Sequence, residues 1–452
     1  MQADKASNMT TVLRDVYLKN QNLFILNDKV IKAREFIEQV IYRRDYLIQQ
    51  KSVYWAICAE DVFWFCIDFF GVLLARKVPV LLPNNREGTL ADLREHYDMA
   101  LFDQDDQNLQ TPERDGVFNE LTDIDQLLLN AEANVVLFTS GSSGKPKKII
   151  RTLSNFDNEI SAIEKKFATF ALDGIFYASV LPQHLYGLTF YILWPLLTGH
   201  IIATEKINYQ EQLMPHLVDN KVVFISSPGL LSRFSTDGSF PVKELIVLSS
   251  GGHLKTSVAD HLKNALADEI LEIFGSSETG AIAYRRQFKK NLWQVFDGVK
   301  ISQALSGALV VDSLFFNHAQ SKKLITSDQV KLLNQQHFEL LGRLDRVVKI
   351  ESKRLSLEEM EQKLIQSKLV EGCYCLALET HRQLVAAVIV LSKRGKIELK
   401  TYNKRYINDQ LRHHLSNYFD LVLIPKKFRY VEAIPMNHQS KIQLDRVKAL
   451  FD

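Results

Sequence analysis

A segment rich in glycine, serine and lysine, LFTSGSSGKPK at residues 137–147, combines residue types that bind phosphate. Glycines let the backbone approach a phosphate group, hydroxyls and exposed N–H groups donate hydrogen bonds to its oxygens, and lysines offset its charge. An apolar run that we expect to be a strand leads into this loop. The predicted phosphate-binding residues are Thr139, Ser140, Gly141, Ser142, Ser143, Gly144, Lys145 and Lys147.

Two other interpretations of this loop must be considered. A P-loop needs four residues between its glycines and a hydroxyl after its lysine, whereas Gly141 and Gly144 enclose two residues and Pro146 follows the lysine. The spacing therefore excludes a P-loop. A flexible surface linker stays open, because runs of serine and glycine are common in loops.

The same segment resembles the signature loop of the adenylate-forming superfamily, which includes acyl- and aryl-CoA synthetases, luciferases and the adenylation domains of peptide synthetases. Further segments resemble other motifs of this superfamily in the same order along the chain, and together they span residues 137–446. The roles expected of these motifs are those that the resemblance implies.

Residues 272–278, EIFGSSE, resemble the aromatic-Gly-x-Thr-Glu segment of the superfamily, with phenylalanine for tyrosine and serine for threonine. An aromatic face can pack on adenine, a hydroxyl can bond a phosphate or carboxylate, and a carboxylate is a hard oxygen ligand for Mg²⁺. The resemblance assigns ATP binding to Glu272, Phe274, Gly275 and Ser276, a catalytic role to Ser277, and the metal to Glu278. Taken alone, Glu278 could instead cap a helix.

Thr326-Ser327-Asp328 resembles the Thr-Gly-Asp motif, whose carboxylate grips both ribose hydroxyls. A carboxylate can accept both hydrogen bonds at once. The resemblance makes Asp328 a ribose ligand and Arg343, in the segment GRLD, a second ribose or phosphate contact.

Two segments resemble those that border the acyl pocket. PQHLYG at residues 182–187 places His184 at the pocket, where it would gate or line the site, although a lone histidine is more often structural. Gly251 and Gly252 resemble a glycine pair lining the pocket, where they would make room for an apolar acyl or aryl group.

The remaining motifs lie in the last quarter of the chain. GRLDRVVKIESKR resembles the hinge motif and puts Asp345 at the pivot, with Ser352 where relatives usually have glycine. PMNHQSK resembles the catalytic-lysine loop, so Lys441 would stabilise the charge that develops as pyrophosphate leaves.

The resemblance implies two half-reactions in one site. A carboxylate attacks the α-phosphate of ATP, with Mg²⁺ and the 139–147 loop holding the pyrophosphate, and a pantetheine thiol then attacks the acyl-AMP after the small domain pivots. The implied cofactors are ATP and Mg²⁺. We expect the acceptor to be separate from this chain, either free coenzyme A or an acyl carrier protein.

The acid is predicted to carry no amino group. Amino-acid-activating relatives commonly place an aspartate in the segment that matches PQHLYG, and no aspartate lies between Phe176 and Thr189. A buried ammonium without a counter-charge is costly. A fatty, aryl or short unsaturated acid is therefore favoured. An amino-acid-activating enzyme and a catalytically silent adenylate-binding protein stay open, the latter because Ser327, Ser352 and Ser440 replace glycines.

The elements that must position these motifs follow an α/β pattern. Short apolar, β-rich runs alternate with helical periodicity through the first three-quarters, and the runs end at small-residue turns suited to a ligand. These runs are NVVLFTS, GIFYASVLP, HIIATE, KVVFISSP, ELIVLSSGG and EILEIFGSS. After about residue 343 the pattern becomes that of a compact α+β unit. We predict an α/β fold with a large domain over 1–343 for ATP and acyl binding, a hinge, and a small mobile domain over 346–452 that carries the catalytic lysine.

Composition excludes several classes of protein. The formal charge of the 452 residues is +2, with no stripe of one sign, so nucleic acid is an unexpected partner. Four scattered cysteines do not suit a disulfide framework, and no secretory signal is visible. The apolar stretch 62–75 is too short to span a bilayer and is predicted to be a buried helix followed by a strand at VPVLL. We expect a cytoplasmic protein without integral membrane association.

Overall fold

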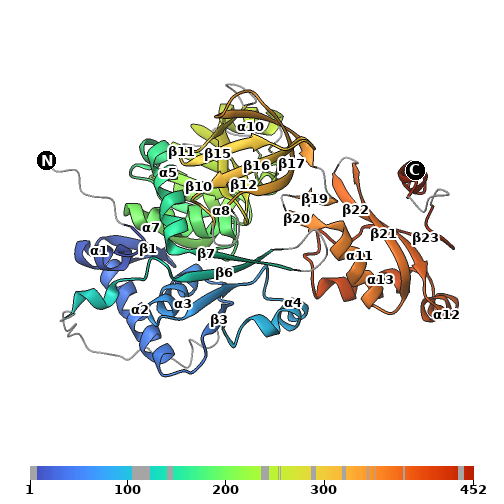
Figure 1. Ribbon diagram of the computed structural model, residues 1–452, viewed down its shortest axis with the longest axis horizontal. Helices are drawn as coiled ribbons and strands as arrows, with labels where there is room; N and C mark the ends of the chain where they lie inside the picture. The colour runs from blue at the N-terminus through green and yellow to red at the C-terminus, as the bar shows by residue number, and fades with distance from the viewer. Residues whose placement is uncertain are drawn as a thin grey trace. The chain divides into compact units, whose positions relative to one another are not determined.

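The structure is a computed structural model. It describes residues 8–103, 123–139, 146–235, 244–252, 254, 256–286, 292–317, 322–343, 346–351, 353–379, 382–435 and 442–452. Two compact units are present (Figure 1). The first comprises Met1–Asn84, Leu93–Phe138 and Lys148–Leu344, and the second comprises Asn85–Asp92, Thr139–Lys147 and Asp345–Asp452.

The first unit is built on a long mixed sheet. Its strand order is β15-β16-β17-β18-β14-β13-β12-β11-β10-β8-β9-β1-β2. In chain order the strands are β1 (Asn22–Leu26), β2 (Lys29–Lys32), β8 (Ile175–Ala178), β9 (Ile201–Lys206), β10 (Lys221–Ser226), β11 (Glu244–Ser249), β12 (Glu269–Ser276), β13 (Gly280–Arg285), β14 (Trp293–Val295), β15 (Val299–Gln303), β16 (Ala308–Ser313), β17 (Leu324–Leu332) and β18 (His337–Arg343).

The centre of this sheet is parallel and buried on both faces. Strands β8, β10, β11 and β12 pair in parallel, with Ser226 opposite Ser249 and Ser249 opposite Glu272. In β10, Val223 and Ile225 face one apolar core while Val222 and Phe224 face another, which explains the nearly continuous apolar sequence. The carboxyl ends of these strands therefore share one edge.

A second sheet in this unit has the order β5-β3-β4-β6-β7. Its strands are β3 (Tyr54–Ile57), β4 (Val78–Leu81), β5 (Met99–Leu101), β6 (Asn134–Thr139) and β7 (Lys147–Thr152). The two sheets contribute to a shared apolar core, in which Ile57 and Leu81 belong to the same cluster as Phe176 and Ile225.

Helices cover both sheets of this unit. Their bounds are α1 (Val12–Lys19), α2 (Ala33–Ile48), α3 (Val62–Leu74), η1 (Arg94–His96), η3 (Ile124–Leu127), α5 (Leu153–Ala171), α6 (Leu185–Gly187), the π-helix η4 (Leu188–Leu193), α7 (Trp194–Thr198), α8 (Gln210–Leu213), η5 (Met214–Leu217), α9 (Pro228–Leu231) and α10 (Thr256–Ala265). Helix α3 begins where the Asp61 side chain accepts hydrogen bonds from two backbone N–H groups, and almost all of it is buried.

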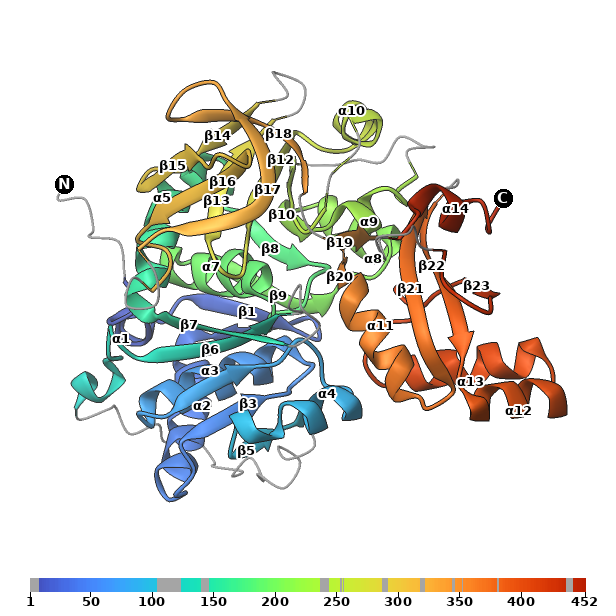
Figure 2. The same ribbon diagram turned by 45° about the vertical axis from the view of Figure 1, so that its right-hand side comes forward.

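The second unit is an α+β arrangement around the sheet β21-β22-β23 (Figure 2). Its elements are α4 (Glu87–Asp92), β19 (Val347–Ile350), β20 (Lys353–Ser356), α11 (Leu357–Gln366), β21 (Val370–Glu379), β22 (Gln383–Leu391), α12 (Lys393–Thr401), α13 (Lys404–Ser416), β23 (Lys427–Tyr430) and α14 (Leu444–Lys448). One face of β22 packs on α11 and α13, and its other face packs on Val447 of α14.

The elements predicted from the sequence are largely confirmed. Each of the six apolar runs became a strand, and the stretch 62–75 became the buried helix α3, followed by β4. No helix within the described ranges is long and apolar enough to cross a membrane. All four cysteines are free thiols.

The composition of the second unit differs from the expected division at residues 343–346. This unit includes residues 85–92, which the sequence pattern placed in the large domain. Two ion pairs connect these residues to the rest of the unit: Arg86 Nη2 lies 2.5 Å from Asp420 Oδ1, and Lys363 pairs with Asp92. The assignment of 1–343 and 346–452 to functional domains stays a prediction.

Candidate active site

The turn between β12 and β13 carries the segment predicted to bind ATP and metal. Gly275 and Ser276 end β12 opposite Ala281 and Gly280, after a register shift at Phe274. A Cβ on Gly275 would lie 2.1 Å from the carbonyl oxygen of Gly280. Only glycine fits at residue 275 because the two strands approach so closely there.

Two hydroxyl groups fix this turn from within. Ser276 N donates to Thr279 Oγ1 at 3.1 Å, Thr279 N donates to Ser276 Oγ at 3.3 Å, and Thr279 Oγ1 donates to the carbonyl of Gly280 at 3.0 Å. Ser277 and Glu278, at the tip of the turn, are half-buried. The predicted catalytic hydroxyl and metal-binding carboxylate therefore share one rigid turn.

Phe274 and Glu272 lie on the strand that leads to the turn. The Phe274 ring packs on Trp293 and Phe338, with centroid distances of 5.2 and 5.6 Å. Glu272 Oε2 accepts a hydrogen bond from Arg285 Nε at 2.6 Å, and Oε1 accepts one from the backbone of Leu254 at 3.0 Å.

The two contacts of Glu272 are typical of a buried residue that stabilises the fold. Its side chain is 2% exposed, and the Arg285 guanidinium that pairs with it lies 4.4 Å from the Trp293 ring centroid. Leu254, held by this carboxylate, follows the predicted pocket glycines Gly251 and Gly252 by two residues. A direct contact of Glu272 with ATP stays a prediction.

The backbones of the two predicted ribose ligands are paired in neighbouring strands. Asp328 in β17 is the register partner of Arg343 in β18, and Asp328 N donates to Thr326 Oγ1 at 3.1 Å. Asp328 is half-buried. The Arg343 side chain lies outside what the structure describes, although its backbone ends β18.

The predicted acid-pocket residues follow β8 and β11, which end at the same edge of the sheet as β12. His184 is exposed and immediately precedes α6, while Gly251, with φ of +84°, follows β11. Tyr186, two residues after His184, is half-buried with its hydroxyl oxygen inside the protein, and this burial raises the pKa of the phenol well above the ordinary value.

The phosphate loop is described only at its two ends. Thr139 ends β6 with a buried hydroxyl that has no hydrogen-bond partner among the described residues, and Lys147 is exposed at the start of β7. Ser140, Gly141, Ser142, Ser143, Gly144, Lys145, Asp345 and Lys441 lie outside the described residues, so their predicted roles stay predictions.

Three residues near this turn were missed in the sequence. Thr279 locks the turn, and Glu159 and Arg151 form a buried ion pair beside it. Glu159 could have been noticed, because it interrupts the apolar face of α5 that contains Phe156 and Ile163. A carboxylate on an apolar helix face indicates a buried partner.

The fold that carries this turn and the strand pair β17–β18 is also found in solved structures of adenylate-forming enzymes. A structure of o-succinylbenzoate CoA synthetase from Bacillus subtilis matches with a TM-score of 0.78 and 14% identity, covering 97% of this chain and 98% of that one. A malonyl-CoA ligase matches with a TM-score of 0.72 and 15% identity, covering 92% and 97%.

The chain belongs to the AMP-binding enzyme family, whose sequence profile matches residues 57–303. D-alanine–D-alanyl carrier protein ligase of Bacillus licheniformis is 25% identical over 361 residues, which are 69% of this chain and 70% of the relative. A mycosubtilin synthase of Bacillus subtilis is 26% identical over 366 residues, 70% of this chain; this chain spans only 13% of that protein.

The predicted superfamily and fold class are thereby confirmed. The family match makes the chain an AMP-binding enzyme. Its ligase reaction, its use of ATP with Mg²⁺ and its thiol acceptor belong to the function proposed below.

Proposed function

We propose that this chain activates a non-amino carboxylic acid as its acyl-AMP, releasing pyrophosphate, and then transfers the acyl group to a pantetheine thiol. The observation that carries the proposal is the turn at 276–279, where reciprocal hydroxyl bonds hold Ser277 and Glu278 at the end of a buried strand. Such preorganised polar groups favour a reaction in which charge develops on phosphate oxygens.

In the first half-reaction, a carboxylate oxygen of the acid bonds to the α-phosphorus of ATP and the bond to the β-phosphate breaks. Glu278 would hold Mg²⁺, which neutralises charge on the leaving pyrophosphate when bound. Ser277 and the loop residues from Thr139 to Lys147 would orient the phosphates, while Asp328 and Arg343 would hold the ribose. Lys441 would bridge the acid and the α-phosphate.

In the second half-reaction, the thiol sulfur attacks the acyl carbon, its proton is lost and AMP leaves. A pivot at Asp345 would withdraw Lys441 and admit the pantetheine arm. The acceptor is coenzyme A or an acyl carrier protein. We place the reaction in the cytoplasm, because the four cysteines are free thiols and thiols persist in a reducing compartment.

The non-amino character of the acid rests on the segment around His184. No carboxylate lies between Phe176 and Thr189. An ammonium entering beside this segment would find no negative partner on it. The runner-up is an amino acid, which the likeness to a D-alanine ligase favours.

The test is pyrophosphate release with ATP and Mg²⁺ across panels of aryl, fatty and amino acids, including D-alanine. The variant Lys441→Ala removes the proposed catalytic ammonium, and Lys448→Ala, exposed on α14, is the matched control. We expect release with one class of non-amino acid, lost by about 10²-fold or more in the first variant and unchanged in the second.

Other outcomes would decide between the alternatives. Release only with amino acids would replace the proposal by amino-acid activation. Binding of ATP without release from any acid would indicate a silent adenylate-binding protein. Full activity of Lys441→Ala would remove the role given to that lysine.

A further inference from the structure

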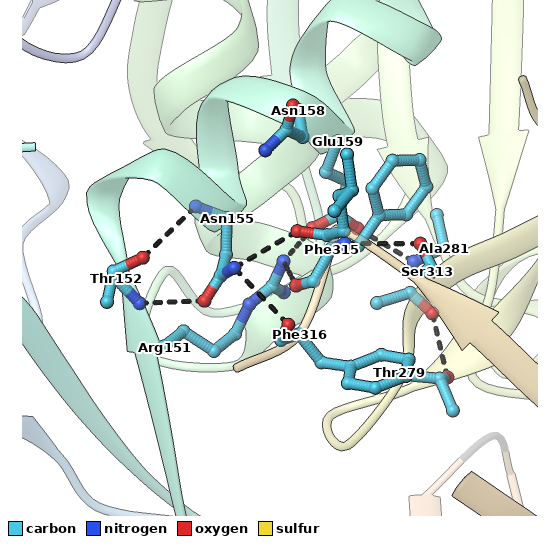
Figure 3. A network of polar contacts seen from close by, with 12 residues as sticks. Arg151, Thr152, Asn155, Asn158, Glu159, Thr279, Ala281, Ser313, Phe315 and Phe316 are labelled. Atoms are coloured by element: carbon cyan, nitrogen blue, oxygen red, sulfur yellow. Dashed lines mark hydrogen bonds and ion pairs between the residues drawn. The ribbon is translucent and has the colours of Figure 1, made fainter. Parts of the chain in front are cut away.

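A buried ion pair connects β7 and α5 to the turn that carries Ser277 and Glu278. The side chains of Arg151 and Glu159 are 0% and 1% exposed, and Arg151 Nη2 lies 2.5 Å from Glu159 Oε2. The same nitrogen donates to the carbonyl of Phe315, and the guanidinium lies 4.4 Å from the Phe156 ring centroid. Figure 3 shows Arg151 of β7 and Glu159 of α5 pointing toward each other.

The second carboxylate oxygen of Glu159 holds the turn itself. Glu159 Oε1 accepts a hydrogen bond of 2.7 Å from the backbone N–H of Ala281. The neighbouring Gly280 has φ of +72°, and a Cβ there would lie 3.0 Å from the same oxygen. The carboxylate thus lies directly against the backbone of the turn, with no room for a side chain between them.

The start of α5 is fixed independently, which makes the position of Glu159 well defined. Thr152 and Asn155 form a capping box, with reciprocal bonds of 2.9 and 3.3 Å. The Asn155 amide also donates to the carbonyls of Leu314 and Phe316, at 3.0 and 3.3 Å. Helix α5 is therefore attached both to the turn and to the segment that follows β16.

Stability alone does not account for charges at these sites. A buried ion pair loses the hydration of both groups, and well-packed apolar residues in its place are often as stable. Glu159 also lies on an apolar helix face, between Phe156 and Ile163. What the carboxylate provides, and an apolar side chain would not, is an acceptor for the backbone at Ala281.

We propose that Arg151 and Glu159 are positioning residues that hold the turn of residues 276–280 in the geometry for binding Mg²⁺-ATP. The inference rests on the proposed function, because it takes the turn to face the nucleotide phosphates. Arg151 acts through Glu159, by orienting its carboxylate, and Glu159 acts through the backbone at Ala281.

The experiment is calorimetric titration of the full chain with Mg²⁺-ATP and, separately, with AMP. Glu159→Ala removes both the charge and the acceptor, and Glu159→Gln keeps an acceptor for Ala281. Asp68→Asn is the matched control, since Asp68 is buried and 2.8 Å from Arg43, on helices that carry none of the predicted site residues.

We expect Glu159→Ala to weaken Mg²⁺-ATP binding by about tenfold or more while AMP binding changes by less than about threefold. A turn that positions Glu278 affects the metal and the β- and γ-phosphates, which AMP lacks. Glu159→Gln should fall between wild type and Glu159→Ala. Asp68→Asn should lower the melting temperature and leave both affinities unchanged.

Each other result is decisive. Equal weakening of Mg²⁺-ATP and AMP, or wild-type affinity in Glu159→Ala, would overturn the positioning role. If Glu159→Ala does not fold, the same comparison is made with Glu159→Gln. A wild-type chain that binds Mg²⁺-ATP but releases no pyrophosphate would overturn the proposed function alone, and one that binds no Mg²⁺-ATP would overturn both.

Discussion

Replacing Gly275 by alanine should strongly reduce catalysis while the chain still folds. The added Cβ would lie 2.1 Å from the Gly280 carbonyl oxygen and 2.9 Å from its carbonyl carbon, whereas ordinary contacts begin at 3.4 Å. Both atoms belong to backbone, so no flexible side chain can move aside. Because Gly275 lies in a strand, alanine is compatible with its backbone conformation, and the obstacle is space alone.

The size of the effect follows from that overlap. The strands β12 and β13 must separate by about 1 Å, and overpacking of this kind typically costs about 1–3 kcal/mol. In a unit of this size such a loss lowers the melting temperature by roughly 2–6 °C. A displacement of about 1 Å at a reacting group can cost on the order of 10²-fold in rate. Since the turn carries Ser277 and Glu278, we expect a loss of that order in pyrophosphate release.

The assay is initial-rate pyrophosphate release at saturating acid, with melting measured on the same samples. Gly372→Ala is the control, because among the described residues a Cβ at Gly372 in β21 would meet only Val390, at 4.0 Å. We expect the control to keep wild-type rates. If Gly275→Ala kept activity within about twofold of wild type, the close approach of the two strands would not matter to catalysis and the placement of the active turn would be refuted.

Two further predictions concern titratable groups. Burial raises the pKa of Glu359 from 4.5 to about 7 despite the opposing charge of Lys363, so the folded chain binds more protons than the unfolded chain between these values. The free energy of unfolding that this site contributes should fall by about 1–3 kcal/mol as pH rises from 4.5 to 7. Urea unfolding at pH 5 and 8 should show a smaller change in stability for Glu359→Gln than for the wild type. The same change in both proteins would contradict the prediction. Burial raises the pKa of Cys58 and Cys373 to about 12, so both thiols should react with a disulfide reagent at least about tenfold slower in the native chain than in denaturant, and fast native labelling would refute this.

The order of elements and the candidate turn could be predicted from the sequence because both depend on local patterns. Apolar runs of four to six residues predicted β8, β10, β11 and β12, since a parallel strand buried on both faces needs an unbroken apolar sequence. Glycine beside serine and glutamate predicted the turn after β12. Glycine ends a strand, and the hydroxyl and carboxyl groups next to it can bind a ligand at the strand end.

The resemblance to the family could also be seen in the sequence. The sequence could not show which polar residues contact a ligand and which stabilise the fold. Glu272 lies in a motif, yet both its oxygens are occupied by Arg285 and the backbone of Leu254. Glu159 lies in no motif, yet its carboxylate holds the turn through Ala281, more than a hundred residues away.

The sequence by itself determined the strands, the helices and the glycine turn, because local propensity and burial patterns act over a few neighbouring residues. Only the tertiary structure decided the partners of the charged groups. Arg151 meets Glu159 and Phe315, and Arg86 meets Asp420, because packing brings distant segments together. A buried charge must find a partner wherever the fold places one, and that place is set by the packing of whole sheets and helices.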